Sequence, residues 1–331
     1  MAGSGNSHLR DGDTVLRIEH LVVEFDAPKG KKVHAVSDIS FDVVEGETLG
    51  LVGESGCGKS TTAKAILQLP PPTSGSVLYR DMDLTELTGE ALRRLRPEIQ
   101  MIFQDPIASL NPRRRVFDIV SEGLSVWGGA KEGGFAEDRV AAIIEDVGLD
   151  AEAARSRRPH EYSGGQCQRI SVARALVLDP RILICDEPVS ALDVSVQAQI
   201  INMLQEMKER YSLTIVFISH DLSVVKNVSD RVAVMYLGKL CEVGDGDLVF
   251  ARPAHPYTRL LMAAVPDPNN PHSGTHETLE GELPSPIDPP SGCRFRTRCP
   301  RAQDICASEE PQISQAHPGS DHWVACHFPL D

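Results

Sequence analysis

The glycine-rich octapeptide Gly53–Ser60 (GESGCGKS) constrains this chain more than any other feature. It fits the pattern G-x-x-x-x-G-K-[ST], follows the short apolar segment Thr48–Val52, and opens a segment of helical pattern, Lys59–Leu69. Glycines allow successive backbone N–H groups to converge on phosphate oxygens, and the N-terminus of a helix adds a partial positive charge. A strand, a loop and a helix in this order predict an α/β fold that binds a nucleoside triphosphate.

Each polar residue of this loop has an expected role. Lys59 is predicted to reach the β- and γ-phosphates, the Ser60 hydroxyl to ligate Mg²⁺, and Thr61 to contact the α-phosphate. Phe25 is the candidate for stacking on the adenine ring, with His34 as the alternative. The predicted ATP-binding residues of the loop are Gly53, Glu54, Ser55, Gly56, Cys57, Gly58, Lys59, Ser60 and Thr61.

A second motif, Ile182–Glu187 (ILICDE), places two carboxylates after an apolar run of strand length. Asp186, at the end of the expected strand, is predicted to reach the Mg²⁺ shell. Glu187 is predicted to orient and deprotonate the attacking water. An acidic pair at a strand end can also be a solvated corner of a sheet, but its place downstream of Lys59 favours the catalytic interpretation.

Length and composition bound the remaining possibilities. A chain of 331 residues fits one domain of more than 200 residues with a smaller appendage. No apolar stretch approaches the ~20 residues that span a bilayer, and Met1–Arg10 lacks the apolar core of a secretory signal. The protein is therefore expected in the cytosol, reaching a membrane only through a partner. A net charge of −14 argues against binding to nucleic acid.

Hydrophobic patterns predict how the chain alternates between strands and helices. Val15–Phe25 and Val33–Val44 are expected to form antiparallel strands. Further on, apolar strands alternate with helical patterns, which indicates a mostly parallel sheet covered on both faces. The expected strands are Glu98–Phe103, Ile182–Cys185 and Thr214–Ile218, and the expected helices lie in 116–149, 164–178 and 194–210.

The segment Ser163, Gly164, Gly165 and Gln166 stands between these two motifs, just before an expected helix. Alone, it would indicate an ordinary N-capped helix. In this position it resembles the signature motif of the ABC ATPase family, although Tyr162 stands where Leu is commonest. The resemblance implies a second phosphate-binding surface, which closes over the γ-phosphate held by an opposite subunit.

Three further positions resemble landmarks of the same family. Gln104 resembles the Q-loop glutamine, a ligand of Mg²⁺ or water that also senses the membrane partner. Ser190 and Asp193 lie in a segment similar to the D-loop, which crosses the dimer interface, and His220 resembles the switch histidine that contacts the γ-phosphate. The resemblance implies catalysis by Glu187, His220 and Gln104, and Mg²⁺ ligation by Ser60, Gln104 and Asp186.

Longer segments are similar to the ATPases of dipeptide and oligopeptide permeases, in particular their F-type subunits. These segments are 53–64 (GESGCGKSTTAK), 101–112 (MIFQDPIASLNP), 159–174 (PHEYSGGQCQRISVAR) and His255–Thr258 followed by Val265 and Pro266. The likeness covers about residues 14–328. It implies a peptide importer in which two unlike ATPase subunits dock on two membrane permeases at the cytoplasmic face. An extracytoplasmic binding protein delivers the peptide.

Four of the eight cysteines crowd into the end of the chain, at Cys293, Cys299, Cys306 and Cys326. Four cytosolic thiolates point to a metal. Structural zinc usually has closer cysteine pairs, but His317, His322 and His327 keep zinc as an alternative. A metal-free tail is a second alternative. An iron–sulfur cluster tolerates varied spacings. The permease family's tail can hold a [4Fe–4S] cluster, and the resemblance implies a structural one here.

We therefore expect a P-loop NTPase of the ABC type with an antiparallel β-subdomain. Its expected parts are a flexible tail (1–13), an ATPase domain (14–245) with a helical subdomain at about 110–178, and a loop-rich C-terminal extension (246–331). A non-transport ABC protein is less favoured, because no coiled-coil insertion or second ATPase domain is visible. The intact motifs disfavour a non-catalytic subunit. Nickel, another small nutrient or an exported peptide remain alternative cargoes.

Overall fold

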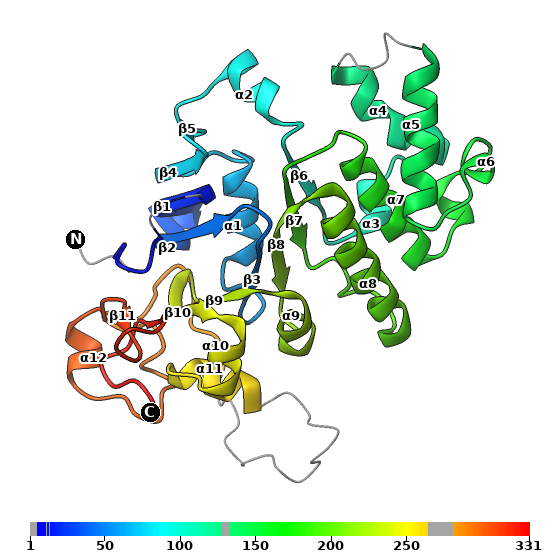
Figure 1. Ribbon diagram of the computed structural model, residues 1–331. Coiled ribbons are helices and arrows are strands. Elements are labelled where there is room, and N and C mark those ends of the chain that lie inside the picture. The colour runs from blue at the N-terminus through cyan, green and yellow to red at the C-terminus, as the bar shows by residue number, and fades with distance from the viewer. Residues whose placement is uncertain (1–4, 11, 13, 128–132, 264–280) are drawn as a thin grey trace. The chain divides into compact units, whose positions relative to one another are not determined.

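The computed structural model of the chain describes residues 5–10, 12, 14–127, 133–263 and 281–331. The chain forms two compact units (Figure 1). We call Met1–Leu87 together with Ile218–Asp331 the loop unit, and Thr88–Phe217 the signature unit. Parts of the expected N-terminal tail and the pair Val265 and Pro266 lie outside the described residues. Within the described ranges, no helix is long and apolar enough to cross a membrane.

An antiparallel sheet begins the loop unit, as the sequence predicts. β1 pairs with β2 and with β4, and β4 pairs with β5, in the order β2-β1-β4-β5. Alternating side chains of β1, such as Leu16 and Ile18, are fully buried. The strands are β1 (Thr14–Ala27), β2 (Lys31–Val44), β4 (Ser74–Tyr79) and β5 (Met82–Asp83), and a 3-10 turn (Pro28–Gly30) joins the first two.

A second group of strands in the loop unit has the order β11-β12-β10-β9-β3. Every residue of β3 and β9 is buried, which explains their nearly continuous apolar sequences. Only the β3–β9 pair is parallel, so the expectation of a mostly parallel sheet fails at this edge. The strands are β3 (Thr48–Val52), β9 (Arg231–Tyr236), β10 (Lys239–Asp245), β11 (Ser314–Gln315) and β12 (His322–Val324).

The first helix of the loop unit is shorter than the sequence suggests. It was expected to reach Leu69 but ends at Ile66, because Leu67 leaves the helical region and Gln68 has a φ of 57°. The helices of the loop unit are α1 (Lys59–Ile66), α9 (Leu222–Val228), α10 (Gly246–Ala251), α11 (Pro256–Ala263) and α12 (Ile305–Ser308).

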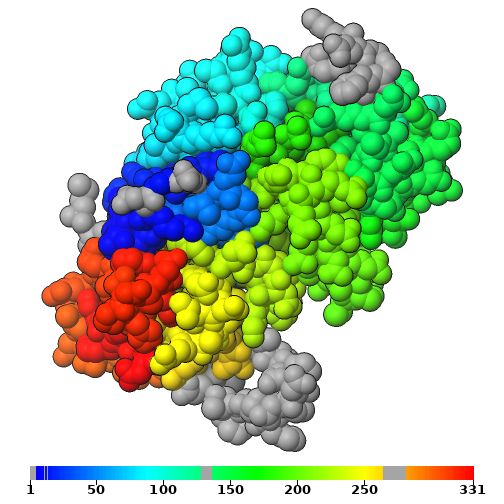
Figure 2. Space-filling model, in the orientation of Figure 1, coloured from blue at the N-terminus to red at the C-terminus, as the bar shows by residue number. Residues whose placement is uncertain are grey.

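Both ends of the described chain pack onto the loop unit. β12 pairs with β10, so that Val243 stands opposite Trp323. Near the other end, His8 is buried and its Nε2 lies 2.7 Å from the carbonyl oxygen of Ser40. The rings of His8 and Trp323 lie 6.5 Å apart, and Figure 2 shows the blue N-terminal region against the orange and red C-terminal region. The C-terminal extension thus continues a sheet of the ATPase core.

The signature unit has three strands in the order β8-β7-β6, with β6 and β7 parallel. The helical pattern predicted over 116–149 is divided between two helices, α4 and α5. Helix α7 contacts α3, α4 and α8. The strands are β6 (Ile99–Ile102), β7 (Ile182–Asp186) and β8 (Thr214–Ser219), the last reaching into the loop unit. The helices are α2 (Gly89–Leu95), α3 (Pro106–Ser109), α4 (Val116–Trp127), α5 (Gly133–Asp146), α6 (Ala151–Ala154), α7 (Gly164–Leu176) and α8 (Val194–Tyr211), with a 3-10 turn at Pro159–Glu161.

Candidate functional site

The glycine-rich loop between β3 and α1 packs against two strands at distances that admit only glycine. Gly53 and Gly58 have φ values of 151° and 108°. A Cβ on Gly53 would lie 2.1 Å from the carbonyl oxygen of Met235 in β9, and one on Gly58 would lie 2.3 Å from that of Ala35 in β2. The loop is therefore fixed in its curled shape by its own chain.

Lys59 is buried at the start of α1, with 4% of its surface exposed. Its Nζ donates hydrogen bonds to the carbonyl oxygens of Gly53, at 2.8 Å, and of Glu54, at 3.0 Å. The ammonium group is thus held over the loop that the sequence assigns to phosphate. Burial raises the pKa of the Cys57 thiol, and Lys59 only partly offsets this, so Cys57 is a neutral packing residue at physiological pH.

Glu54, the second residue of the loop, has two partners from the C-terminal part of the chain. Its carboxylate accepts two hydrogen bonds from the Arg298 guanidinium, at 2.7 and 3.0 Å. Its backbone N–H donates to the Tyr257 hydroxyl at 2.9 Å. Sequence reasoning did not assign a role to either partner. The available signals were an acidic residue inside a phosphate loop and an arginine beside Cys299.

The two adenine candidates lie on the hairpin that backs the loop. Phe25 is 40% exposed and pairs with Val33, two residues before the Ala35 that packs against Gly58. An exposed aromatic ring is free to stack on a base. His34 instead lies with its Nδ1 2.8 Å from a carboxylate oxygen of Glu24. Phe25 therefore stays the candidate for the stacking residue, with His34 as the alternative.

The two acidic residues of the second motif are buried at the end of β7, in the signature unit. Glu187 has a φ of 47°, a conformation that costs a non-glycine residue about 1–3 kcal/mol. Its carboxylate accepts a hydrogen bond of 2.9 Å from the side-chain amide of Gln104. Its carbonyl oxygen accepts a hydrogen bond of 3.1 Å from the Ser190 hydroxyl. The structure thus brings Gln104 and the expected base together.

Ser163 caps helix α7 in the signature unit. The Ser163 hydroxyl accepts from the Gln166 N–H at 3.3 Å, and the Gln166 side chain accepts from the Ser163 N–H at 2.9 Å, a capping box. A Cβ on Gly165 would lie 2.6 Å from a methyl carbon of Val196, so glycine lets α7 approach α8. Ser163 and Gln166 are exposed, and the motif presents a helix N-terminus to solvent.

The two remaining family landmarks are also exposed. Asp193 is the N-cap residue of α8, and the first residue of the helix, Val194, is 81% exposed. His220 is exposed on the turn between β8 and α9, where the Asp221 side chain accepts hydrogen bonds from the first N–H groups of α9. Of the expected Mg²⁺ ligands, Ser60 belongs to the loop unit, and Gln104 and Asp186 belong to the signature unit.

The four C-terminal cysteines, Cys293, Cys299, Cys306 and Cys326, line one pocket together with His255 and His327. Burial, followed by repulsion from the neighbouring thiols, raises the pKa of Cys293 and of Cys326 to about 11.

No group of three or more His, Cys, Asp or Glu side chains in the described ranges is arranged so that it could hold a metal ion. Two of the histidines that kept zinc possible do not line the cysteine pocket. His322 lies 2.5 Å from the buried Glu242 carboxylate, and His317 packs against His322.

Comparisons with known proteins identify the family. Residues 36–190 match the ABC transporter model, and residues 241–306 match the model of the oligopeptide/dipeptide transporter C-terminal region. The chain is 48% identical to the oligopeptide transport ATP-binding protein OppF of Salmonella typhimurium, over 97% of this chain and 98% of that one. It is 49% identical to OppF of Escherichia coli, over 94% and 95% of the two chains.

This chain belongs to the family of oligopeptide transport ATP-binding proteins. It is an ATP-binding, ATP-hydrolysing subunit of the ABC transporter type, as its motifs imply. A dimeric structure of the ATP-binding cassette MJ0796, bound to ADP and Pi, has 26% identity and a TM-score of 0.63, over 70% of this chain and 98% of that one. The predicted fold class is therefore confirmed.

Proposed function

We propose that this chain hydrolyses ATP to energise the import of di- and oligopeptides, from the cytoplasmic face of a membrane. One observation carries the proposal. The loop unit contains both the buried phosphate loop and an extension that matches the C-terminal region of oligopeptide transporters. In this proposal the ATPase domain spans 14–245, with a helical subdomain at about 110–178. The C-terminal extension spans 246–331.

The phosphate loop and Lys59 bind the triphosphate, and Phe25 stacks on the base. Glu187 takes the proton of the attacking water. The hydrogen bond from the Gln104 side-chain amide holds the Glu187 carboxylate in its orientation. Ser60, Gln104 and Asp186 would hold Mg²⁺, which would supply positive charge to neutralise the phosphates. His220 donates to the γ-phosphate.

A second ATPase subunit completes the site. Gly164 and Gly165 are the first residues of α7, and Ser163 and Gln166 beside them are exposed in the described part of the chain. Such a helix N-terminus binds the γ-phosphate of a partner's ATP. The related ATP-binding cassette MJ0796 is dimeric in a structure bound to ADP and Pi, which supports a dimer of ATPase subunits here. The two ATPase subunits close on ATP and separate after hydrolysis. Ser190 and Asp193 lie at the interface between these subunits.

Two exposed apolar side chains flank Gln104. Phe103 is 38% exposed and Ile107 is 62% exposed. Exposed large apolar residues at one place mark a contact surface. We assign this surface to one of two membrane permease subunits, so that movement of the permease reaches Gln104, and through it Glu187.

The four C-terminal cysteines fit a [4Fe–4S] cluster. Its ligands would be Cys293, Cys299, Cys306 and Cys326, which line one pocket and supply only sulfur. A single tetrahedral zinc ion, with Zn–S bonds of ~2.3 Å, needs its four ligands much closer together than a cluster does. A cluster is therefore the occupant that we propose for these cysteines, and zinc is the alternative. When bound, it would tie together the loops of the extension.

The cargo is tested in vesicles that contain this chain with its partner ATPase, permeases and binding protein. Peptides of two to five residues, supplied with the binding protein, should stimulate ATP hydrolysis and accumulate inside. Nickel should do neither. The Glu187→Gln vesicles serve as the control without turnover. Stimulation by nickel or another nutrient, with none by peptides, would assign the alternative cargo.

The cluster is tested by anaerobic purification and analysis of iron and sulfide. The native chain should contain about four of each, and Cys306→Ser should lose them. Cys167→Ser is the matched control, because Cys167 is also buried but lies in α7. A native chain that carries zinc, or no metal, would overturn this part of the proposal.

A further inference from the structure

The phosphate loop contains one acidic side chain, and a basic residue from the far end of the chain is bound to it. Glu54 and Arg298 are 244 positions apart, yet both guanidinium Nη atoms reach the two carboxylate oxygens. Only 7% of the Arg298 side chain and 21% of the Glu54 side chain are exposed. Such a two-point contact, shielded from water, fixes orientation as well as charge.

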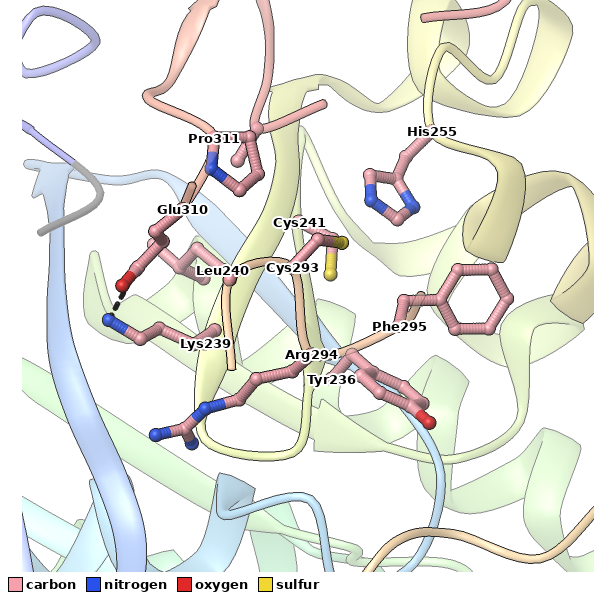
Figure 3. Close-up of a pocket in the computed structure, with 12 residues that line it drawn as sticks. Tyr236, Lys239, Leu240, Cys241, His255, Cys293, Arg294, Phe295, Glu310 and Pro311 are labelled. Atoms are coloured by element: carbon pink, nitrogen blue, oxygen red, sulfur yellow. Dashed lines mark ion pairs between the residues drawn. The ribbon is translucent and has the colours of Figure 1, made fainter. Parts of the chain in front are cut away.

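Arg298 is itself held by a group of aromatic rings. Its guanidinium lies 5.8 Å from the ring centre of Tyr236 and 3.4 Å from the Tyr236 hydroxyl. Tyr236 in turn packs edge-on against Tyr257, at 4.7 Å, and against Phe295, at 5.1 Å. Figure 3 shows Tyr236 and Phe295 among the side chains that line a pocket together with Cys241 and Cys293.

These rings connect the segment Cys293–Cys299 to the phosphate loop. Phe295 and Arg298 both lie between Cys293 and Cys299, and the Arg298 N–H donates to the Phe295 carbonyl oxygen at 2.9 Å. Tyr257 accepts from the Glu54 N–H, so the same cluster holds the backbone as well as the side chain of Glu54. Two anchors thus meet on a single residue of the loop.

The charge of Glu54 would otherwise oppose the ligand. Its carbonyl oxygen is a partner of Lys59, so its carboxylate belongs to a residue that lies directly against the expected phosphate position. A carboxylate near a polyanion is repelled, and shielding from water strengthens the repulsion. Arg298 cancels this charge without itself belonging to the loop.

We propose that Arg298 is a positioning residue of the ATP site: it neutralises Glu54 and fixes the first turn of the phosphate loop. The cysteine extension then sets the affinity of this subunit for ATP, rather than serving only as a structural appendage. This inference rests on the proposed assignment of Gly53–Ser60 to ATP.

The test is calorimetric titration of the full-length chain with Mg·ATP. Arg298→Gln should raise the Kd by about tenfold or more, because Glu54 is left as an uncompensated charge. Glu54→Gln, which leaves the positive charge of Arg298 uncompensated beside the phosphates, should lower the Kd. The double variant, Glu54→Gln with Arg298→Gln, should return toward the Kd of the native chain, because the two opposite charges are removed together. Arg298→Lys, which keeps the charge but loses the fork, should fall between the native chain and Arg298→Gln.

A purely structural ion pair predicts a different result. The double variant lacks the fork as well, so it would then bind ATP as weakly as Arg298→Gln. That result, an unchanged Kd in Arg298→Gln, or a tenfold loss in Glu54→Gln alone would overturn the inference. Lys59→Ala tests the assignment of the loop separately from the role of Arg298. Retained ATP binding in Lys59→Ala would refute that assignment, whatever the result for Arg298.

Discussion

The phosphate loop and the signature motif are both glycine-rich helix N-termini, but they differ in burial and in the contacts that hold them. The loop Gly53–Ser60 is enclosed: β2 and β9 press on its glycines, Lys59 is buried, and the C-terminal extension holds Glu54. The signature residues Ser163–Gln166 are exposed at their ends and are fixed mainly by a capping box.

This difference separates a surface that is finished within one chain from a surface that needs a second chain. A loop that is curled before ATP arrives does not lose that conformational freedom on binding. An exposed helix N-terminus gains most when an anion covers it. The predictions that follow probe this contrast.

Glu187→Gln should lower the rate of ATP hydrolysis by about 10²–10⁴-fold, since the glutamine cannot take the proton of the attacking water. ATP binding should survive, because neither the loop nor the signature motif is altered. The variant should therefore accumulate as an ATP-bound closed dimer, measured by its sedimentation with and without ATP. Full turnover in this variant would show that Glu187 is not the base.

Gly58→Ala should lower the free energy of unfolding by about 2–3 kcal/mol, because the added Cβ meets the Ala35 carbonyl oxygen at a positive φ. Gly164→Ala is the matched change in the signature motif. Its Cβ would lie 3.5 Å from Leu192, an ordinary contact, so the loss should stay below about 1 kcal/mol. Urea denaturation measures both, and equal losses would contradict the contrast between the two motifs.

Ser163→Ala should cost about 1 kcal/mol of stability, the usual effect of removing a helix N-cap. Ser163→Asp should recover much of that stability, since Asp also caps helices. It should nevertheless impair hydrolysis in the assembled transporter, because a carboxylate repels the partner's γ-phosphate. Thermal unfolding and phosphate release follow the two effects, and normal hydrolysis in Ser163→Asp would remove this residue from the phosphate surface.

The sequence predicts the continuous motifs well and the long-range contacts poorly. Gly53–Ser60 and Ile182–Glu187 each carry their strand, turn and functional groups in one short segment, so local pattern suffices. The Glu54–Arg298 pair joins residues 244 apart, and no periodicity reports such a contact.

The C-terminal extension was expected to be loop-rich and stapled by a metal. That expectation overlooked β12, a strand of three residues that pairs with β10. A strand this short has too few residues to show alternation. The expectation for the C-terminal extension also missed Phe295, because its packing against Tyr236 depends on tertiary contacts that local sequence does not encode. Tertiary contacts decide both features.

The central claim is that this chain binds ATP through its own loop but uses it only with a partner. Calorimetry on the isolated full chain, paired with ATP hydrolysis by the assembled transporter, tests this with Lys59→Ala and Ser163→Arg. Lys59→Ala should abolish ATP binding by the isolated chain. Ser163→Arg should leave that binding unchanged and lower hydrolysis in the transporter at least tenfold. Loss of ATP binding by the isolated Ser163→Arg chain, or normal hydrolysis in its transporter, would contradict the account.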